Sequence, residues 1–198
     1  ILAGLFTPDS GEIYIDGRRV FINNPKQAQQ LGISMIYQEI RLFPDLNIAE
    51  NIFIGREPLR KLKWVRAIDW DKLYRETRKY LDYFGLEVNP RLPVNALSIG
   101  QQKFVEIIKA LSQNASIIIM DEPTSAITLK EVEKLFFKIR ELKARGVSII
   151  YISHKLEEVY RICDRVLVLR DGHVVGCHDI NDIDEQTLIE EMVGRKVE

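Results

Sequence analysis

Cysteine is nearly absent from this 198-residue sequence: its two copies, Cys163 and Cys177, match no metal-binding spacing and make no disulfide framework. The sequence also lacks any apolar run near the roughly 18 residues of a membrane span. No charge of one sign dominates, since 28 basic and 29 acidic residues leave a formal net charge of −1. Nucleic-acid-binding proteins usually have a basic surplus, so we expect no nucleic-acid partner. The composition is otherwise ordinary for one globular domain.

Two adjacent carboxylates follow a short apolar run. Residues 117–120 are apolar and lead directly to Asp121 and Glu122, and Pro123 comes next. This pattern predicts a fully buried strand of a parallel sheet that ends at the proline. Open α/β sheets bind ligands at the carboxyl ends of their strands. In phosphoryl-transfer enzymes such a first acid holds Mg²⁺, and a second can orient water. The alternative is an ordinary strand end with two solvated acids.

A second motif precedes this strand. Leu97-Ser98-Ile99-Gly100-Gln101 is followed by apolar residues at helical spacing, which are Phe104, Val105, Ile108 and Leu111. Ser98 and Gln101 form a capping-box pattern, so we expect Ser98 to cap a helix. The free N–H groups and the positive dipole end of such a helix bind anions. The alternative is a well-capped helix with no further role.

The order of the two motifs resembles the ATP-binding cassette (ABC) family. The resemblance implies an α/β fold of the P-loop NTPase type, with a mostly parallel sheet and an inserted helical subdomain. It also implies that Asp121 holds Mg²⁺ and that Glu122 is the catalytic base. The first motif corresponds to the family signature, which contacts ATP held by the opposing cassette through Ser98, Ile99, Gly100 and Gln101.

Three further positions fit the same family. Gln38 follows a short predicted strand and matches the Q-loop glutamine, which reaches the Mg²⁺ or the attacking water. His154 follows a predicted strand over 147–152 and matches the switch histidine at the γ-phosphate. Taken alone, a glutamine or histidine at a strand end is more often a surface or structural residue. Thr128 stands where many members have aspartate, and with Glu131 it forms a second capping-box pattern.

Finer details resemble the ATP-binding proteins of bacterial monosaccharide importers of the ribose/galactose/xylose type, and within them the first of two cassettes. These details are Ile99 in the signature, the Gln38-Glu39 pair, and residues 47–56 and 192–196. The resemblance implies ATP and Mg²⁺ as cofactors and coupling of ATP hydrolysis to carbohydrate uptake. The implied partners are a second cassette, transmembrane permease subunits and, indirectly, a periplasmic sugar-binding protein. The implied location is the cytoplasmic face of the membrane.

One absence bears on the family directly. No Gly-x-x-x-x-Gly-Lys-Ser/Thr occurs in the sequence, although this P-loop supplies backbone N–H groups and a lysine to the phosphates. Family members place it just before a helix that ends in a sequence like residues 1–5. We therefore expect an N-terminally truncated cassette that is inactive alone and begins with a helix remnant. Residues 1–45 and 116–198 are expected to form the core, and residues 46–115 the helical signature subdomain.

Local signals predict several element boundaries. Asp16-Gly17 predicts the turn of a hairpin, and Asp69 and Gly85 predict the ends of one helix. Patterns in the last third predict a helix around 156–162, a strand at 165–169, a turn at 171–172 and a helix near 185–193.

Two other functions stay open at this level. One is a non-catalytic truncated cassette that acts as an interaction or regulatory module. A weaker alternative is a soluble ABC ATPase of translation or DNA repair, which would lack the sugar-importer details.

Overall fold

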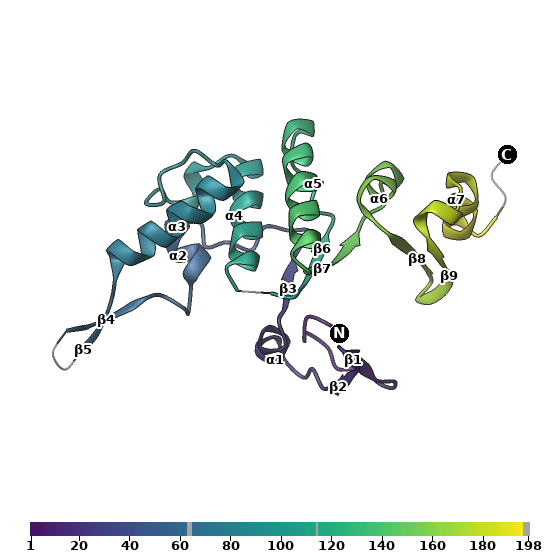
Figure 1. Ribbon diagram of the computed structural model, residues 1–198, viewed down its shortest axis with the longest axis horizontal. Helices are drawn as coiled ribbons and strands as arrows, with labels where there is room; N and C mark the ends of the chain where they lie inside the picture. The colour runs from purple at the N-terminus through teal and green to yellow at the C-terminus, as the bar shows by residue number, and fades with distance from the viewer. Residues whose placement is uncertain (63–64, 114, 196–198) are drawn as a thin grey trace. The chain divides into compact units, whose positions relative to one another are not determined.

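The computed structural model describes residues 1–62, 65–113 and 115–195 (Figure 1). Lys196, at the end of the closing motif, lies outside the described residues. The chain forms two compact units, Ile1–Ile150 and Tyr151–Glu198, and each is described by itself. No helix in the described parts of the chain is both long and apolar enough to cross a membrane.

A three-stranded sheet organises the first unit. Its strand order is β3 (Ile33–Ile36), β6 (Ile117–Asp121), β7 (Ser148–Ile152). β3 and β6 are parallel, with Ile33 opposite Ile117 and Ile36 opposite Met120. Ile118 and Met120 are fully buried, as expected for a continuous apolar strand inside an α/β fold. The α/β fold with a parallel sheet is therefore confirmed.

The N-terminal part contains a hairpin of β1 (Ile13–Ile15) and β2 (Arg18–Val20), followed by α1 (Pro25–Gln30). Asp16 and Gly17 both have positive φ, 51° and 73°, so the predicted turn is confirmed. The expected helix remnant at residues 1–5 is wrong: these residues form turns and bends. Gly4 has a φ of 76°, the left-handed conformation in which helices often end, but the three residues before it are too few to close an α-helical hydrogen bond.

The part of the chain that connects β3 to β6 forms three helices, which pack against one another (Figure 1). They are α2 (Ile48–Phe53), α3 (Trp70–Phe84) and α4 (Ile99–Leu111), and η1 (Val94–Ala96) precedes α4. The predicted ends of α3 are confirmed, since Asp69 caps its start and Gly85 ends it in the left-handed conformation. A hairpin of β4 (Leu59–Leu62) and β5 (Val65–Ile68) interrupts this helical region. The sequence of this hairpin does not predict it, because its residues lack a regular apolar alternation.

α5 (Leu129–Ala144) follows β6 and buries one apolar face, which consists of Val132, Leu135, Phe136, Ile139 and Leu142.

The division of the chain into segments 1–45, 46–115 and 116–198 stays a prediction.

The second unit contains α6 (Leu156–Ile162), β8 (Arg165–Arg170), β9 (His173–Asp179), η2 (Ile180–Asp182) and α7 (Glu185–Val193). β8 and β9 are antiparallel and turn at Asp171 and Gly172. Its small core is formed by Val168, Ile183 and Leu188. The predicted bounds of α6, β8 and α7 are confirmed, whereas β9 is an addition to the predicted elements.

Candidate nucleotide site

The two predicted carboxylates lie at the carboxyl end of β6. Asp121 is the last residue of the strand, and Glu122 follows with a φ of 43°. A left-handed backbone is uncommon for a residue other than glycine and costs of order 1–3 kcal/mol. Such strained residues cluster at functional sites, where the surrounding structure holds them. The chain therefore turns sharply at Glu122, directly after a buried strand.

The structure brings Gln38 to Glu122. Gln38 Nε2 donates a hydrogen bond to Glu122 Oε2 over 3.3 Å, although the two residues are 84 positions apart. The parallel pairing of β3 and β6 produces this contact, because the carboxyl ends of the two strands lie at the same end of the sheet. Two predicted site residues therefore lie side by side.

A buried ion pair, which was not predicted from the sequence, forms hydrogen bonds with the backbone beside Gln38. Lys103 Nζ donates to the carbonyl oxygens of Tyr37 and Gln38 and pairs with Glu106 Oε2 at 3.0 Å. Glu106 Oε1 accepts from the backbone N–H of Arg41 at 3.1 Å. The available signal was a lysine and a glutamate three residues apart inside an otherwise apolar helical stretch, where only a paired charge can be buried.

A second buried polar residue, Asn51, fixes the loop that follows. Its amide nitrogen donates to the carbonyl oxygens of Phe43, Leu46 and Asn47, and its oxygen accepts from the N–H of Phe43 at 2.7 Å. Asn51 is fully buried on α2. Both N–H donors of the carboxamide and its oxygen are thereby engaged by this loop.

The signature residues form the N-terminus of α4. The capping box is confirmed: Gln101 N donates to Ser98 Oγ, and Ser98 N donates to Gln101 Oε1. Ile99 is 59% exposed. Gly100 is buried against α5, so that a Cβ placed there would lie 2.4 Å from a carboxylate oxygen of Glu131. A side chain at this position would therefore require the Glu131 carboxylate to move.

The second capping box is also confirmed. Thr128 N and Oγ1 both donate to Glu131 Oε2 at 2.8 Å, and Glu131 N donates to Thr128 Oγ1. Thr128 thus caps α5 at the position where many family members have aspartate.

Comparison with known families decides the assignment. The family model described as ABC transporter matches residues 1–125. The chain belongs to the ABC transporter family. This confirms the family predicted from the signature and the Asp-Glu strand.

Curated relatives of this ABC cassette extend over the whole chain. It is 47% identical over 197 residues to the ribose import ATP-binding protein RbsA of Rhodopirellula baltica and 44% identical to that of Caldanaerobacter subterraneus subsp. tengcongensis. It is 43% identical to a putative ribose/galactose/methyl galactoside import ATP-binding protein of Agrobacterium fabrum. These matches cover 100% of the chain but only 38–39% of the relatives.

Solved structures show the same fold. A nucleotide-free ATP-binding cassette from an ABC transporter superposes with a TM-score of 0.79 at 24% identity, over 96% of this chain and 79% of that one. A dimeric, post-hydrolysis ATP-binding cassette bound to ADP and Pi gives a TM-score of 0.73 at 26% identity, over 90% of this chain and 77% of that one.

His154 lies in the second unit of the cassette, between β7 and α6. The next residue, Lys155, donates its backbone N–H to Ser153 Oγ at 3.0 Å, which shapes the entry into α6. The role of His154 at the γ-phosphate stays a prediction.

The donor set at the end of β6 fits a magnesium ion. Mg²⁺ prefers oxygen ligands and is usually held by one or two carboxylates together with waters and substrate phosphates. Asp121 supplies a carboxylate, and a carboxamide such as Gln38 that donates through its nitrogen keeps its oxygen for a cation. The described residues contain no group of three or more His, Cys, Asp or Glu that could hold a metal by themselves.

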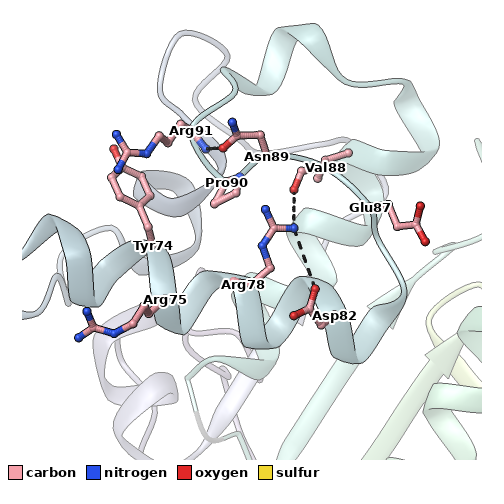
Figure 2. Close-up of a pocket in the computed structure, with 9 residues that line it drawn as sticks. All are labelled: Tyr74, Arg75, Arg78, Asp82, Glu87, Val88, Asn89, Pro90 and Arg91. Atoms are coloured by element: carbon pink, nitrogen blue, oxygen red, sulfur yellow. Dashed lines mark hydrogen bonds and ion pairs between the residues drawn. The ribbon is translucent and has the colours of Figure 1, made fainter.

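A different part of the cassette contains an open cavity of about 590 Å³, between α3 and residues 87–91 (Figure 2). Arg78 crosses it to donate to the carbonyl oxygen of Val88 at 3.0 Å, and the guanidinium of Arg91 lies 4.2 Å from the centre of the Tyr74 ring. None of the predicted site residues lines this cavity. Asp121 and Glu122 lie instead at the carboxyl end of β6, where Gln38 contacts Glu122.

Proposed function

We infer that this ABC cassette is the ATP-hydrolysing part of a carbohydrate importer. Support for sugar import comes from relatives named as ribose, or putative ribose/galactose/methyl galactoside, import ATP-binding proteins. The chain spans about 38% of their length. We therefore refer to the protein that contains these residues together with a P-loop as the parent protein.

The hydrogen bond between Gln38 and Glu122 is the observation on which the proposed chemistry rests. Glu122 orients and deprotonates the water that attacks the γ-phosphate, and the Gln38 amide holds its carboxylate in place. His154 contacts the γ-phosphate. When bound, Mg²⁺ neutralises charge on the phosphates, and Asp121 and Gln38 are the residues proposed to hold it.

The exposed start of α4 is proposed to act on a second nucleotide. The capping box uses the backbone N–H groups of Ser98 and Gln101. The N–H groups of Ile99 and Gly100 lie outside it, and the turn formed by Ser98, Ile99, Gly100 and Gln101 is suited to an anion, which here is a phosphate of ATP bound by an opposing cassette. Permease subunits in the membrane are the proposed partners for transport, and a periplasmic sugar-binding protein supplies the sugar to them. The cassette is then located at the cytoplasmic face of the membrane.

The test is a comparison of carboxylate variants in the parent protein. Glu122→Gln keeps the shape of the side chain but removes its charge, so turnover should fall about 100-fold or more while nucleotide binding survives. Asp121→Asn should instead raise the Mg²⁺ concentration needed for half-maximal turnover, because a carboxylate binds the cation more strongly than an amide.

Glu87→Gln is the matched control, since Glu87 is an exposed carboxylate at the arginine-lined cavity. It should leave turnover unchanged. Turnover within twofold of the parent in Glu122→Gln would show that Glu122 is not the base.

A further inference from the structure

A buried ion pair on α4 contacts the segment that contains Gln38. The side chains of Lys103 and Glu106 are only 2% and 6% exposed. Removing two charges from water is costly, and a well-packed apolar pair of similar volume is often equally stable or more stable. The attraction between the two charges therefore gives, by itself, little reason for charges at these positions.

The contacts of the pair go to one short stretch of backbone. The three donors of an ammonium group are all used here, by the carbonyl oxygens of Tyr37 and Gln38 and by Glu106. The second oxygen of Glu106 holds the backbone N–H of Arg41. Three of the four bonds therefore fix residues 37–41, and only one joins the two side chains.

Another lysine–glutamate pair with the same spacing behaves differently. Lys79 and Glu76 pair at 2.8 Å on α3, and their side chains are 70% and 34% exposed. Their hydrogen bonds to each other stay within α3. The spacing is thus common to both pairs, whereas burial and contact with the Gln38 backbone distinguish the pair on α4.

We propose that Lys103 and Glu106 are positioning residues that couple the signature end of α4 to Gln38. Ser98 and Gly100 lie in the first turn of the same helix, less than two turns before Lys103. A displacement of α4, such as that caused by a phosphate engaging its N-terminus, moves the backbone of Gln38 through these bonds. The Gln38 side chain then moves relative to Glu122, to which it donates. This inference rests on the proposed function, since it assigns the coupling to hydrolysis.

The test removes both charges together. Lys103→Met combined with Glu106→Leu leaves no unpaired buried charge, but the Tyr37 and Gln38 carbonyls and the Arg41 N–H lose their partners, so the melting temperature of the parent protein should fall by a few degrees. We expect kcat to fall about tenfold or more, because a small displacement of a catalytic group has a large effect. The Kd for nucleotide should stay within twofold.

Amide hydrogen exchange at single residues reports the coupling directly. In the double variant the Arg41 amide loses its acceptor and should exchange about tenfold faster or more. The Phe43 amide is held by Asn51 instead, so its exchange should change less than twofold. Lys79→Met with Glu76→Leu is the matched control and should alter neither kcat nor exchange at Arg41.

If the double variant does not fold, Glu106→Gln is the second test. It keeps the size of the side chain and weakens the bond to Arg41, so exchange there and kcat should change in the same directions by about threefold or more. The proposal is overturned if kcat stays within twofold, or if exchange at Arg41 rises only together with that at Phe43. A parent protein that hydrolyses no ATP would instead overturn the proposed function, while the exchange pattern would still report whether α4 holds residues 37–41.

Discussion

Three residues at this site have a backbone conformation or a buried charge that is unfavourable in free energy. Glu122 has a left-handed backbone, and Lys103 and Glu106 are buried charges. Each costs free energy unless its surroundings compensate for it. Within the described residues all three lie on one path, from α4 through the Gln38 backbone to the end of β6. The residues with these free-energy costs thus lie next to one another at the proposed site.

Asn51 gives a prediction about stability at this scale. Asn51→Ala leaves the N–H of Phe43 without its present partner and creates a small buried cavity, whereas the carbonyls of Phe43 and Leu46 keep the N–H groups of Leu46 and Val94. We expect the free energy of unfolding to fall by about 2–4 kcal/mol, since unsatisfied buried polar groups are costly. Urea denaturation of the parent protein measures this change.

Asn95→Ala serves as the control for Asn51→Ala. Asn95 is exposed, and its side chain makes only a long contact of 3.5 Å with Asp45. The free energy of unfolding should change by less than about 0.5 kcal/mol, as is typical of surface positions. Similar losses in the two variants would contradict the assignment of Asn51 as the anchor of residues 43–47.

At the scale of the element, α4 has different functions along its length. Its first turn presents the signature, and its middle holds the Gln38 backbone. Its C-terminus is fixed by Arg56, which donates to the carbonyl oxygens of Ser112 and Ile52 at 2.7 and 2.8 Å. Burial lowers the pKa of the Arg56 guanidinium from its ordinary value. A helix held at both its middle and its end can transmit a displacement of its first turn.

The proposed role of the signature predicts that a substitution there impairs hydrolysis at one nucleotide site and not at the other. Ser98→Arg places a long cation at the exposed start of α4, where a phosphate of the opposing nucleotide is proposed to bind. In a parent protein with two cassettes, hydrolysis should fall about 100-fold at the opposite site, while nucleotide binding to the P-loop of its own cassette stays within twofold. Photolabelling of each cassette with a nucleotide, combined with single-turnover hydrolysis, measures both quantities.

Ser98→Ala is the control for this prediction. It removes the cap, at a cost of about 1 kcal/mol, and adds no obstacle to a phosphate. Gly100→Asp is less suitable, because a side chain at this position requires the Glu131 carboxylate, which caps α5, to move. Equal losses at both sites in Ser98→Arg, in proportion to a lower melting temperature, would indicate that the capped helix is only structural.

At the scale of the whole molecule, we predict that the 198-residue chain by itself does not hydrolyse MgATP measurably and binds it very weakly. The sequence has no P-loop motif, and that loop supplies most of the phosphate contacts in this class of enzyme. Isothermal titration calorimetry of the purified chain should show no saturation at micromolar MgATP. A micromolar Kd would contradict the prediction. The parent protein, titrated under the same conditions, is the positive control.

Local patterns in the sequence determined much of the fold. The caps at Ser98, Thr128 and Asp69 and the turn at Asp16-Gly17 are predicted from a few adjacent residues, because their hydrogen bonds join positions two to four residues apart. The buried strand follows from a continuous apolar run. The bounds of α6 and α7 also agree with the sequence prediction. The motif positions and their order likewise identify the family without any coordinates.

Only the tertiary structure decided which of these residues meet. The contact of Gln38 with Glu122 joins positions 84 residues apart, and that of Lys103 with the Gln38 carbonyl joins positions 65 apart. The proximity of Gly100 to the Glu131 side chain joins positions 31 residues apart. β4, β5 and β9 are stabilised by cross-strand pairing rather than by local preference. Contacts of this kind follow from packing and burial, which a spacing along the chain does not encode.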